Sequence, residues 1–552
     1  MQTEKQCYLA VYTRTPDPAR YPRGLADSVH LAWSEDRKIF YPLHRNYGVL
    51  FAVSGINEQN VILREGVRQP RLRRLPDGVY RIDAVRTDRD GVPVTDAARR
   101  TVCWETADFI TFLPCVAEMA ARDDGDGETL TLEDGERVEG SVLAVDAALL
   151  DTARAYWTPL CCTGVTYPAE IPQSALEDFR TEVRYTDGSV HRKRVRWDPD
   201  ARVPLPDGGF RLTGEILQPE YGYPLADGYA DPTLFRWEGK TYFLSTNDNT
   251  DCVGLWVREL TEADPADPLA GEEALILPYD REKGWIQTFW APEFHVIGGR
   301  LCILFALGGE VWGPQCHIMR LREGGSILRA EDWEEPIRVR RQDGRPLTED
   351  GITLDMTFLP TKRGAYMIWS YRQHIGTPLD SGSMLYIGAV REEEPWVILG
   401  DPVLLTRPLY GWENVDGTIN NEGPYVLRRG DSIYLTYSGG AVDFYTYAIG
   451  LLTAADGADL LQTENWRKSG VPIATFLTDA REFGPGHNSF YEDRDGNIRI
   501  LYHAETGRDN HFRRTGSRRI HFDRNDRPVW DLSRERDLLP ALRRVTITVR
   551  GD

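Results

Sequence analysis

A motif that recurs five times in the second half of the chain is the feature that most constrains the fold. Each copy contains an anchor residue, an apolar run, a glycine turn and a second hydrophobic run. The spacings are 60, 65, 66 and 66 residues between the turn glycines Gly239, Gly299, Gly364, Gly430 and Gly496. Self-similarity at a fixed period is typical of architectures in which each copy is one supersecondary unit.

The runs on either side of each glycine have the length and composition of β-strands. Two such runs around a glycine turn indicate a hairpin, and a further strand-like run, such as VGLWVREL or MLYIGAVR, follows each hairpin. No amphipathic helix of adequate length separates the runs, which argues against a parallel α/β fold. We therefore predict an all-β protein in which residues 218–552 form a five-bladed β-propeller.

In a propeller the first strand of each blade lines the central channel. A residue at the start of that strand points at the axis, so the five anchors should meet although they are far apart in sequence. These anchors are Asp231, Trp290, Asp355, Glu422 and His487.

Three of the five anchors are carboxylates, which suits general acid/base chemistry on a glycosidic bond. One carboxyl must protonate the leaving oxygen and another must activate water on the opposite face of the sugar. A third carboxylate raises the pKa of the acid by like-charge repulsion. A structural salt-bridge cluster and a calcium site are the alternatives, although calcium loops usually have closely spaced ligands, which are missing here.

Five stretches carry a resemblance to a known family, in the order and spacing of that family. They are YADPTLF, WAPEFHVIGGRL, TLDMTF, NNEGPYV and GPGHNSF. Over residues 228–530, more than half of the chain, the sequence resembles glycoside hydrolase family 43. The resemblance implies a five-bladed propeller and inverting hydrolysis of pentosides and related sugars.

The resemblance also implies roles for the five anchors. Asp231 matches the general base, Glu422 the general acid, and Asp355 the residue that tunes and orients the acid. Trp290 would be a platform for the apolar face of the sugar. His487 matches an axial histidine that often holds a central Ca²⁺ through water, and its alternative is a hydrogen-bonding role alone. We expect no organic cofactor, because no dinucleotide or P-loop motif is present.

Four further residues are expected to bind substrate, each with a structural alternative. They are Asn247, Glu293, Tyr437 and Arg519. Arg519 matches an arginine region of the fifth blade and could pair with a catalytic carboxylate. Glu293 is a structural or substrate hydrogen-bonding residue, because Glu422 already fills the role of the acid.

The first 220 residues depart from a minimal member of that family. Residues 1–120 are predicted to be a blade-like β accessory region, in which Gln69-Pro70 replaces the Asp-Pro of the first propeller motif. Residues 121–162 are a junction with one helix, in VDAALLDTARAYW. Residues 163–217 resemble an immunoglobulin-like sandwich, since YTDGS is a strong hairpin signal. We expect neither module to be catalytic.

Charge and composition exclude several partners. The net charge is −20 and no long basic run occurs, which argues against nucleic acid and against anionic membranes. No stretch reaches the roughly 18 apolar residues of a membrane span, and no signal peptide is recognisable. The eight cysteines show no CxxC spacing and are predicted to be buried thiols. The chain is therefore expected in the cytoplasm, unless a signal has been removed.

The prediction for function is an inverting exo-glycosidase that releases terminal furanosyl or pentosyl residues, foremost α-L-arabinofuranose, from plant-type glycans. β-Xylosidase and galactofuranosidase activity remain alternatives with the same chemistry. A non-catalytic carbohydrate-binding propeller is the alternative from another class, and loss of any one of the three carboxylates would favour it.

Overall fold

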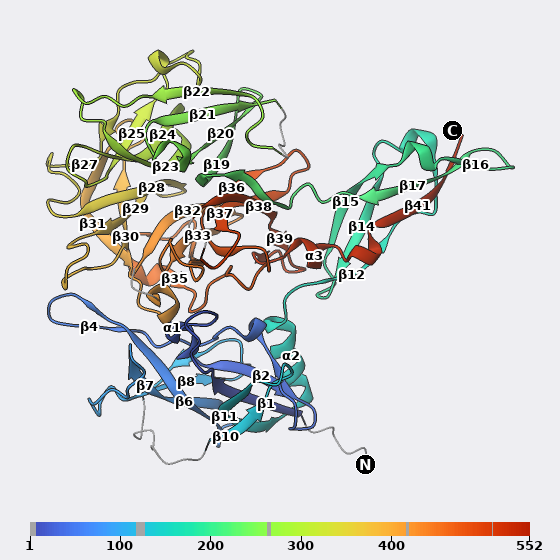
Figure 1. Ribbon diagram of the computed structural model, residues 1–552, viewed down its shortest axis with the longest axis vertical. Helices are drawn as coiled ribbons and strands as arrows, with labels where there is room; N and C mark the ends of the chain where they lie inside the picture. The colour runs from blue at the N-terminus through green and yellow to red at the C-terminus, as the bar shows by residue number, and fades with distance from the viewer. Residues whose placement is uncertain (1–6, 117–126, 262–266, 416–418, 510–511, 552) are drawn as a thin grey trace.

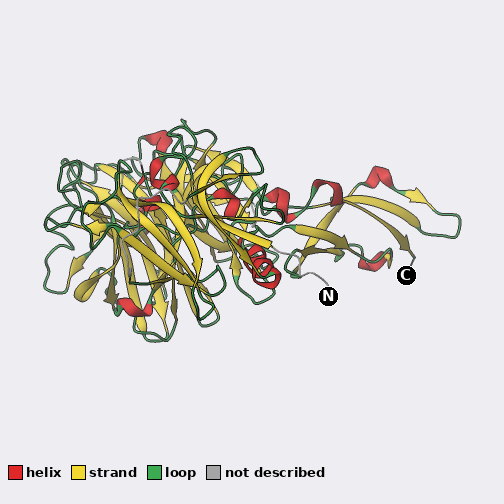
Figure 2. Cartoon of the chain, turned by 90° about the horizontal axis from the view of Figure 1, so that it is seen from below, coloured by secondary structure: helices red, strands yellow, loops and turns green. Residues whose placement is uncertain are grey.

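The computed structural model describes residues 7–116, 127–261, 267–415, 419–509 and 512–551 (Figure 1). Strands dominate it, which confirms the all-β prediction, and they form a propeller, an N-terminal domain and a small sheet that extends sideways (Figure 2). No helix in the described ranges is long and apolar enough to cross a membrane.

Five sheets form the propeller, as predicted. Blade 1 contains β19 (Tyr229–Trp237), β20 (Lys240–Asn247), β21 (Leu255–Leu260) and β22 (Glu272–Leu277), and blade 2 contains β23 (Gln287–Ile297), β24 (Arg300–Gly308), β25 (Gln315–Arg320) and β26 (Ile337–Arg338). Blade 3 contains β28 (Ile352–Thr361), β29 (Gly364–Arg372), β30 (Met384–Val390) and β31 (Val397–Thr406), with β27 (Arg340–Arg341) parallel to β31. Blade 4 contains β32 (Asn421–Arg429), β33 (Ser432–Gly439), β34 (Ala448–Ala455) and β35 (Arg467–Lys468).

Blade 5 closes the ring with a strand that precedes blade 1 in sequence. Its own strands are β36 (Phe483–Glu492), β37 (Ile498–Glu505) and β38 (Arg514–Arg519), and β18 (Gly222–Asp227) pairs with β38. The first strand of each blade contacts the first strand of the next, and β36 returns to β19. The five first strands therefore surround the axis, and separate apolar clusters fill the spaces between neighbouring blades.

The N-terminal domain packs two sheets against each other. One has the order β10 (Glu128–Thr131), β11 (Arg137–Val145), β1 (Cys7–Thr13), β2 (His30–Ser34), β3 (Tyr41–Pro42). The other is the meander β6 (Glu65–Arg74), β7 (Tyr80–Asp88), β8 (Thr101–Thr106), β9 (Leu113–Pro114). The predicted junction helix is α2 (Ala147–Trp157), which packs on the same core. Because β10 and β11 belong to the first sheet, this domain extends past residue 120.

This domain is anchored to blades 3 and 4 of the propeller. Helix α1 (Arg23–Ala26) buries Leu25 in a cluster shared with both blades. The hairpin of β4 (Gly55–Ile56) and β5 (Ile62–Leu63) brings Asn60 to Arg407, whose Nη1 donates to Asn60 Oδ1 at 2.7 Å. The N-terminal domain therefore holds the loop that leads into the first strand of blade 4.

The small sheet bears on two sequence predictions. Its order is β12 (Cys162–Thr166), β14 (Arg180–Tyr185), β15 (Val190–Trp197), β17 (Phe210–Ile216), β41 (Arg544–Arg550), β13 (Glu170–Pro172), with β16 (Val203–Pro204) beside β17. The pairing gives one connected sheet and does not confirm an immunoglobulin-like sandwich. The assignment of all residues 218–552 to the propeller is wrong, because β41 pairs with β17 and buries Val545, Ile547 and Val549 in the core of this sheet.

Candidate active site

The first strands of the five blades share one irregularity. Each shows a register shift against its second strand and a residue with positive φ at the shift. The left-handed residues are Asp231 (φ 51°), Ala291 (47°), Asp355 (52°), Gly423 (55°) and His487 (42°). A β-bulge re-aims a side chain, and such strain is typical of functional sites. The bulge therefore turns Asp231, Asp355 and His487 toward the axis.

Glu422 and Trp290 occupy the position just before the left-handed residue of their blades. The sequence anchors thus fall into two structural classes rather than one. The N-terminal meander has the same bulge, with Gln69 at φ 52° in β6. The resemblance between Gln69-Pro70 and Asp231-Pro232 is therefore also a resemblance of backbone shape.

Asp231 is buried, with 6% of its surface exposed, and basic side chains surround it. Its Oδ1 lies 3.1 Å from His503 Nδ1, 3.3 Å from His487 Nδ1 and 3.5 Å from Arg513 Nη1. Thr246 donates to Oδ2 at 2.5 Å. Burial alone would raise the pKa of Asp231, but His487, Arg513 and His503 outweigh it and hold the pKa well below its usual range. Asp231 is therefore an ionised carboxylate.

Glu422 has the opposite environment. Burial raises its pKa to about 7, although the Tyr447 hydroxyl, which donates to Oε1 at 2.8 Å, acts in the other direction. A carboxyl group in this range is still protonated in an appreciable fraction near neutral pH. The same site thus holds one ionised carboxylate and one carboxyl group able to give up a proton.

Asp355, in blade 3, contacts the backbone beside the acid Glu422, in blade 4. Its Oδ2 accepts the Gly423 N–H at 3.0 Å and the Ser370 hydroxyl at 3.3 Å. Burial and the adjacent Glu422 raise the pKa of Asp355 well above its usual range. Two neighbouring buried carboxyl groups resist double ionisation, so they titrate as a pair. The like-charge effect expected on Glu422 therefore also acts on Asp355.

Arg513 is a site residue that sequence reasoning missed. It forms a bidentate pair with Asp248, from Nε to Oδ2 at 3.0 Å and from Nη2 to Oδ1 at 2.5 Å, while its Nη1 faces Asp231. The arginine predicted for this role, Arg519, lies elsewhere. Arg519 donates to Asp537 and to the Tyr185 hydroxyl, and so joins blade 5 to the small sheet.

Three other predicted substrate residues have structural contacts instead. Tyr437 is fully buried and donates to Glu413 Oε1 at 2.7 Å. Glu293 pairs with His295 Nε2 at 2.6 Å. Asn247 accepts the backbone N–H of the turn that follows β20. These contacts favour the structural alternative for each residue.

Trp290 remains near the carboxylates through its neighbour in sequence. The Ala291 N–H donates to Thr246 Oγ1 at 2.8 Å, and the same hydroxyl donates to Asp231. The Trp290 ring is half-buried. Its role as a sugar platform stays a prediction.

The donors around His487 do not fit a directly bound calcium ion. Calcium takes oxygen ligands, whereas the nearest oxygen, Asp231 Oδ1, already faces two imidazoles and a guanidinium. Across the described ranges, no group of three or more His, Cys, Asp or Glu side chains could hold a metal ion. His487 Nδ1 lies 3.3 Å from Asp231 Oδ1, and a Ca²⁺ ion held by His487 through water stays a prediction.

The chain is similar to several known proteins. The chain is 31% identical over 291 residues to an extracellular exo-α-(1→5)-L-arabinofuranosidase of Streptomyces avermitilis, covering 52% of this chain and 56% of that protein. It is 32% identical over 289 residues to the protein of the same name from Streptomyces chartreusis, covering 51% and 82%. An α-L-arabinofuranosidase structure from Lactobacillus brevis aligns over 56% of this chain and 96% of that one, with 28% identity and a TM-score of 0.49.

The chain thus spans about half the length of the Streptomyces avermitilis relative. The model of glycosyl hydrolases family 43 matches residues 221–528, which include all five blades and the three carboxylates. The chain belongs to family 43 of the glycosyl hydrolases.

Proposed function

We propose that this protein is an inverting exo-glycoside hydrolase that releases terminal α-L-arabinofuranose from arabinose-containing glycans. Asp231 is the general base, Glu422 is the general acid, and Asp355 shares the proton of the acid pair. One observation carries this proposal: the pKa values of two carboxyl groups in one site differ widely. The pKa of Asp231 is well below its usual range, and that of Glu422 is about 7. Environments that separate pKa values in this way distinguish a base from an acid.

The reaction needs one water molecule and no covalent intermediate. Asp231 accepts a proton from the water as its oxygen attacks the anomeric carbon. Glu422 gives its proton to the glycosidic oxygen as the bond to the leaving sugar breaks. The products are the free sugar with inverted configuration and the shortened glycan. One proton has moved onto Asp231 and one has left Glu422, so exchange with solvent restores the starting state.

The arrangement around Asp231 supports the role of base. Arg513, His487 and His503 stabilise the ionised form, and the Thr246 hydroxyl fixes one of its two oxygens. A base with a low pKa is a weak proton acceptor but is ionised over the whole working range. The Arg513 guanidinium then stabilises the carboxylate before attack. The water becomes more acidic as its oxygen bonds to the developing oxocarbenium ion, and Asp231 takes its proton.

The choice of sugar rests on the relatives. Two Streptomyces relatives are named exo-α-(1→5)-L-arabinofuranosidases, and a Pyricularia oryzae relative, 30% identical over 293 residues, is named α-L-arabinofuranosidase B. Two of these relatives are also named extracellular, so the comparisons lend no support to the expected cytoplasmic location.

The test is release of nitrophenol from 4-nitrophenyl α-L-arabinofuranoside, β-D-xyloside, β-D-galactofuranoside and α-L-arabinopyranoside. We expect turnover of the arabinofuranoside, and NMR of the first product formed should show the inverted anomer. If only another glycoside is hydrolysed, that sugar replaces arabinofuranose as the proposed substrate. A product of retained configuration would overturn the inverting mechanism. Silence on this panel and on polymeric arabinan, with Asp231 and Glu422 intact, would favour a binding protein.

A further inference from the structure

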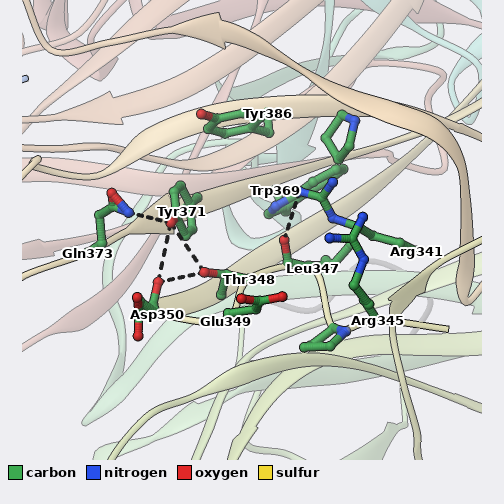
Figure 3. A pocket seen from close by; sticks show the side chains of 12 residues that line it. Arg341, Arg345, Leu347, Thr348, Glu349, Asp350, Trp369, Tyr371, Gln373 and Tyr386 are labelled. Atoms are coloured by element: carbon green, nitrogen blue, oxygen red, sulfur yellow. Dashed lines mark hydrogen bonds between the residues drawn. The ribbon is translucent and has the colours of Figure 1, made fainter. Parts of the chain in front are cut away.

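A cavity lies on the side of blade 3 that faces blade 2 (Figure 3). Its volume is about 350 Å³, which is in the range of pockets that hold small ligands. Trp369, Tyr371 and Tyr386 line it from β29 and β30, and the connection that leads into β28 supplies Thr348 and Asp350. None of these residues belongs to the carboxylate site described above.

The cavity and the carboxylate site share strand β29. Side chains alternate between the two faces of a strand, so neighbours in sequence serve opposite sides of the blade. Ser370 faces the carboxylate site and donates to Asp355, whereas Trp369 and Tyr371 line the cavity. The cavity therefore lies on the opposite side of β29 from the carboxylate site.

Aromatic rings give the cavity the surface that a sugar ring requires. The Tyr371 and Tyr386 rings are 5.5 Å apart and nearly perpendicular, at 86°, and the Trp369 and Tyr386 rings are 6.2 Å apart and nearly parallel. Tyrosine combines an apolar ring with a polar tip. The two half-buried tyrosines can thus contact the C–H face of a sugar and its hydroxyl groups at the same time.

A hydrogen-bond network fixes one wall and leaves groups for a ligand. Gln373 Nε2 donates to the Tyr371 hydroxyl at 2.7 Å, and the Thr348 hydroxyl donates to the Asp350 carbonyl oxygen at 2.5 Å. Within the described ranges, the Tyr386 hydroxyl and the Gln373 side-chain oxygen have no hydrogen-bond partner. One can donate to a sugar hydroxyl and the other can accept from it.

The charges around the cavity favour an uncharged ligand. Arg341 and Arg345 face Glu349 and Asp350 across it, so cations and anions balance. Arg345 already pairs with Asp343 at 2.7 Å. We propose that this cavity binds a neutral pentose unit of the glycan substrate, away from the bond that is hydrolysed. The choice of a pentose rests on the proposed function.

The test compares Gln373→Ala and Tyr386→Phe with the matched control Gln342→Ala, which alters an exposed glutamine of the same connection outside the cavity. All three are made in the Asp231→Asn background and run on native gels that contain sugar-beet arabinan. Loss of one hydrogen bond should weaken retardation about fivefold for each cavity variant. The control should migrate like the parent.

Equal retardation of all four proteins would overturn the cavity as a binding site, as would an equal loss in the control. Binding to arabinan does not require turnover, so the gels also separate this proposal from the proposed function. In the active background, the ratio of kcat/KM on arabinan to kcat/KM on the nitrophenyl arabinofuranoside should fall for the cavity variants and not for Gln342→Ala.

A different observation concerns two cysteines of the N-terminal domain. Cys103 in β8 lies opposite Cys115, which directly follows β9, and the Cys115 N–H donates to the Cys103 carbonyl oxygen at 3.1 Å. Their sulfur atoms are 2.6 Å apart, closer than two unbonded sulfurs normally come, so the roughly 2.05 Å of a disulfide bond needs only a small further approach. Both are free thiols in the structure.

We infer that Cys103 and Cys115 form a disulfide in an oxidising environment. Each thiol loses one proton and one electron, a single S–S bond forms, and one glutathione disulfide is reduced to two glutathione molecules. The predicted thiol state of this pair would then hold only under reducing conditions. The bond would fasten β9, the edge strand of the meander, to β8.

The test uses a tryptic peptide, residues 101–122, that contains both cysteines. The folded protein is incubated with glutathione disulfide, unfolded in acid and treated with N-ethylmaleimide. We expect a peptide two hydrogens lighter than the dithiol and without adducts. A peptide with two maleimide adducts would overturn the inference, and so would two separate glutathione adducts. Cys103→Ser should abolish the light form.

Discussion

The ring of Tyr447 lies parallel to the ring of His503, with an angle of 7° and 5.9 Å between their centres. Tyr447 also donates to Glu422, and His503 Nδ1 lies 3.1 Å from Asp231. The stacked pair thus joins the proposed acid to the proposed base through side chains of blades 4 and 5.

Tyr447→Phe should keep the stacked ring and remove the hydrogen bond to Glu422. That hydrogen bond lowers the pKa of Glu422, so its loss should raise the pKa and move the alkaline limb of kcat/KM upward by about 0.7 pH unit. The measurement is the pH profile on the nitrophenyl arabinofuranoside. Tyr437→Phe is the matched control, since that buried hydroxyl donates to Glu413, and its profile should not move.

Glu422→Gln should discriminate between leaving groups. An acid assists departure, and a nitrophenolate leaves with little help, so arabino-oligosaccharides should lose about 10²–10⁴-fold in kcat and the nitrophenyl glycoside much less. Steady-state rates on the two substrates check this. Equal losses on both would count against Glu422 as the acid.

Arg513→Met should raise the pKa of Asp231, because Arg513 is one of the groups that lower it. The ionised base is the active form, so the acidic limb of kcat/KM should move to higher pH. Arg513→Lys keeps a positive charge and should move the limb less. If the acidic limb is unchanged in folded Arg513→Met, then Arg513 does not lower the pKa of Asp231.

Glu422 should also make stability depend on pH. Its pKa is raised in the folded state, so between about 4.5 and about 7 the folded protein binds more protons than the unfolded chain. Stability is therefore lost as pH rises through this window. Glu422→Gln should escape the loss and gain on the order of 1–3 kcal/mol over the native protein between pH 4.5 and pH 8.

Urea unfolding at the two pH values measures this difference. Glu464→Gln, an exposed change on the same blade, is the control and should show the same difference from the native protein at both values. A Glu422→Gln difference that is flat with pH would contradict the raised pKa.

The blades and the three carboxylates could be predicted because both belong to a repeat that can be recognised in the sequence alone. The bulge that aims Asp231, Asp355 and His487 has no marker in the residue types, since aspartate, alanine, glycine and histidine all occupy its left-handed position. The choice between Arg513 and Arg519 depends on which arginine of one short segment faces the axis. The role of Tyr447 depends on its contact with His503 of blade 5, which the sequence does not show.

The C-terminal strand could not be assigned for a different reason. β41 follows the propeller in sequence but pairs with β17, which precedes it by more than 300 residues. Alternating apolar residues predict a strand and say nothing about its partner. Sequence order suggested a domain boundary at residue 217, and the pairing crosses it.

Because of this pairing, the small sheet joins the segment before the propeller to the segment after it. A sheet begun before the propeller is finished only after every blade has been synthesised, and its late strand lies between β17 and β13 rather than at an edge. The two ends of the propeller segment are thereby held by one sheet. Strand β18, which follows β17 in sequence, also closes blade 5 by pairing with β38. A propeller excised at residue 218 would keep its carboxylates and would carry an apolar strand with nothing to pair with.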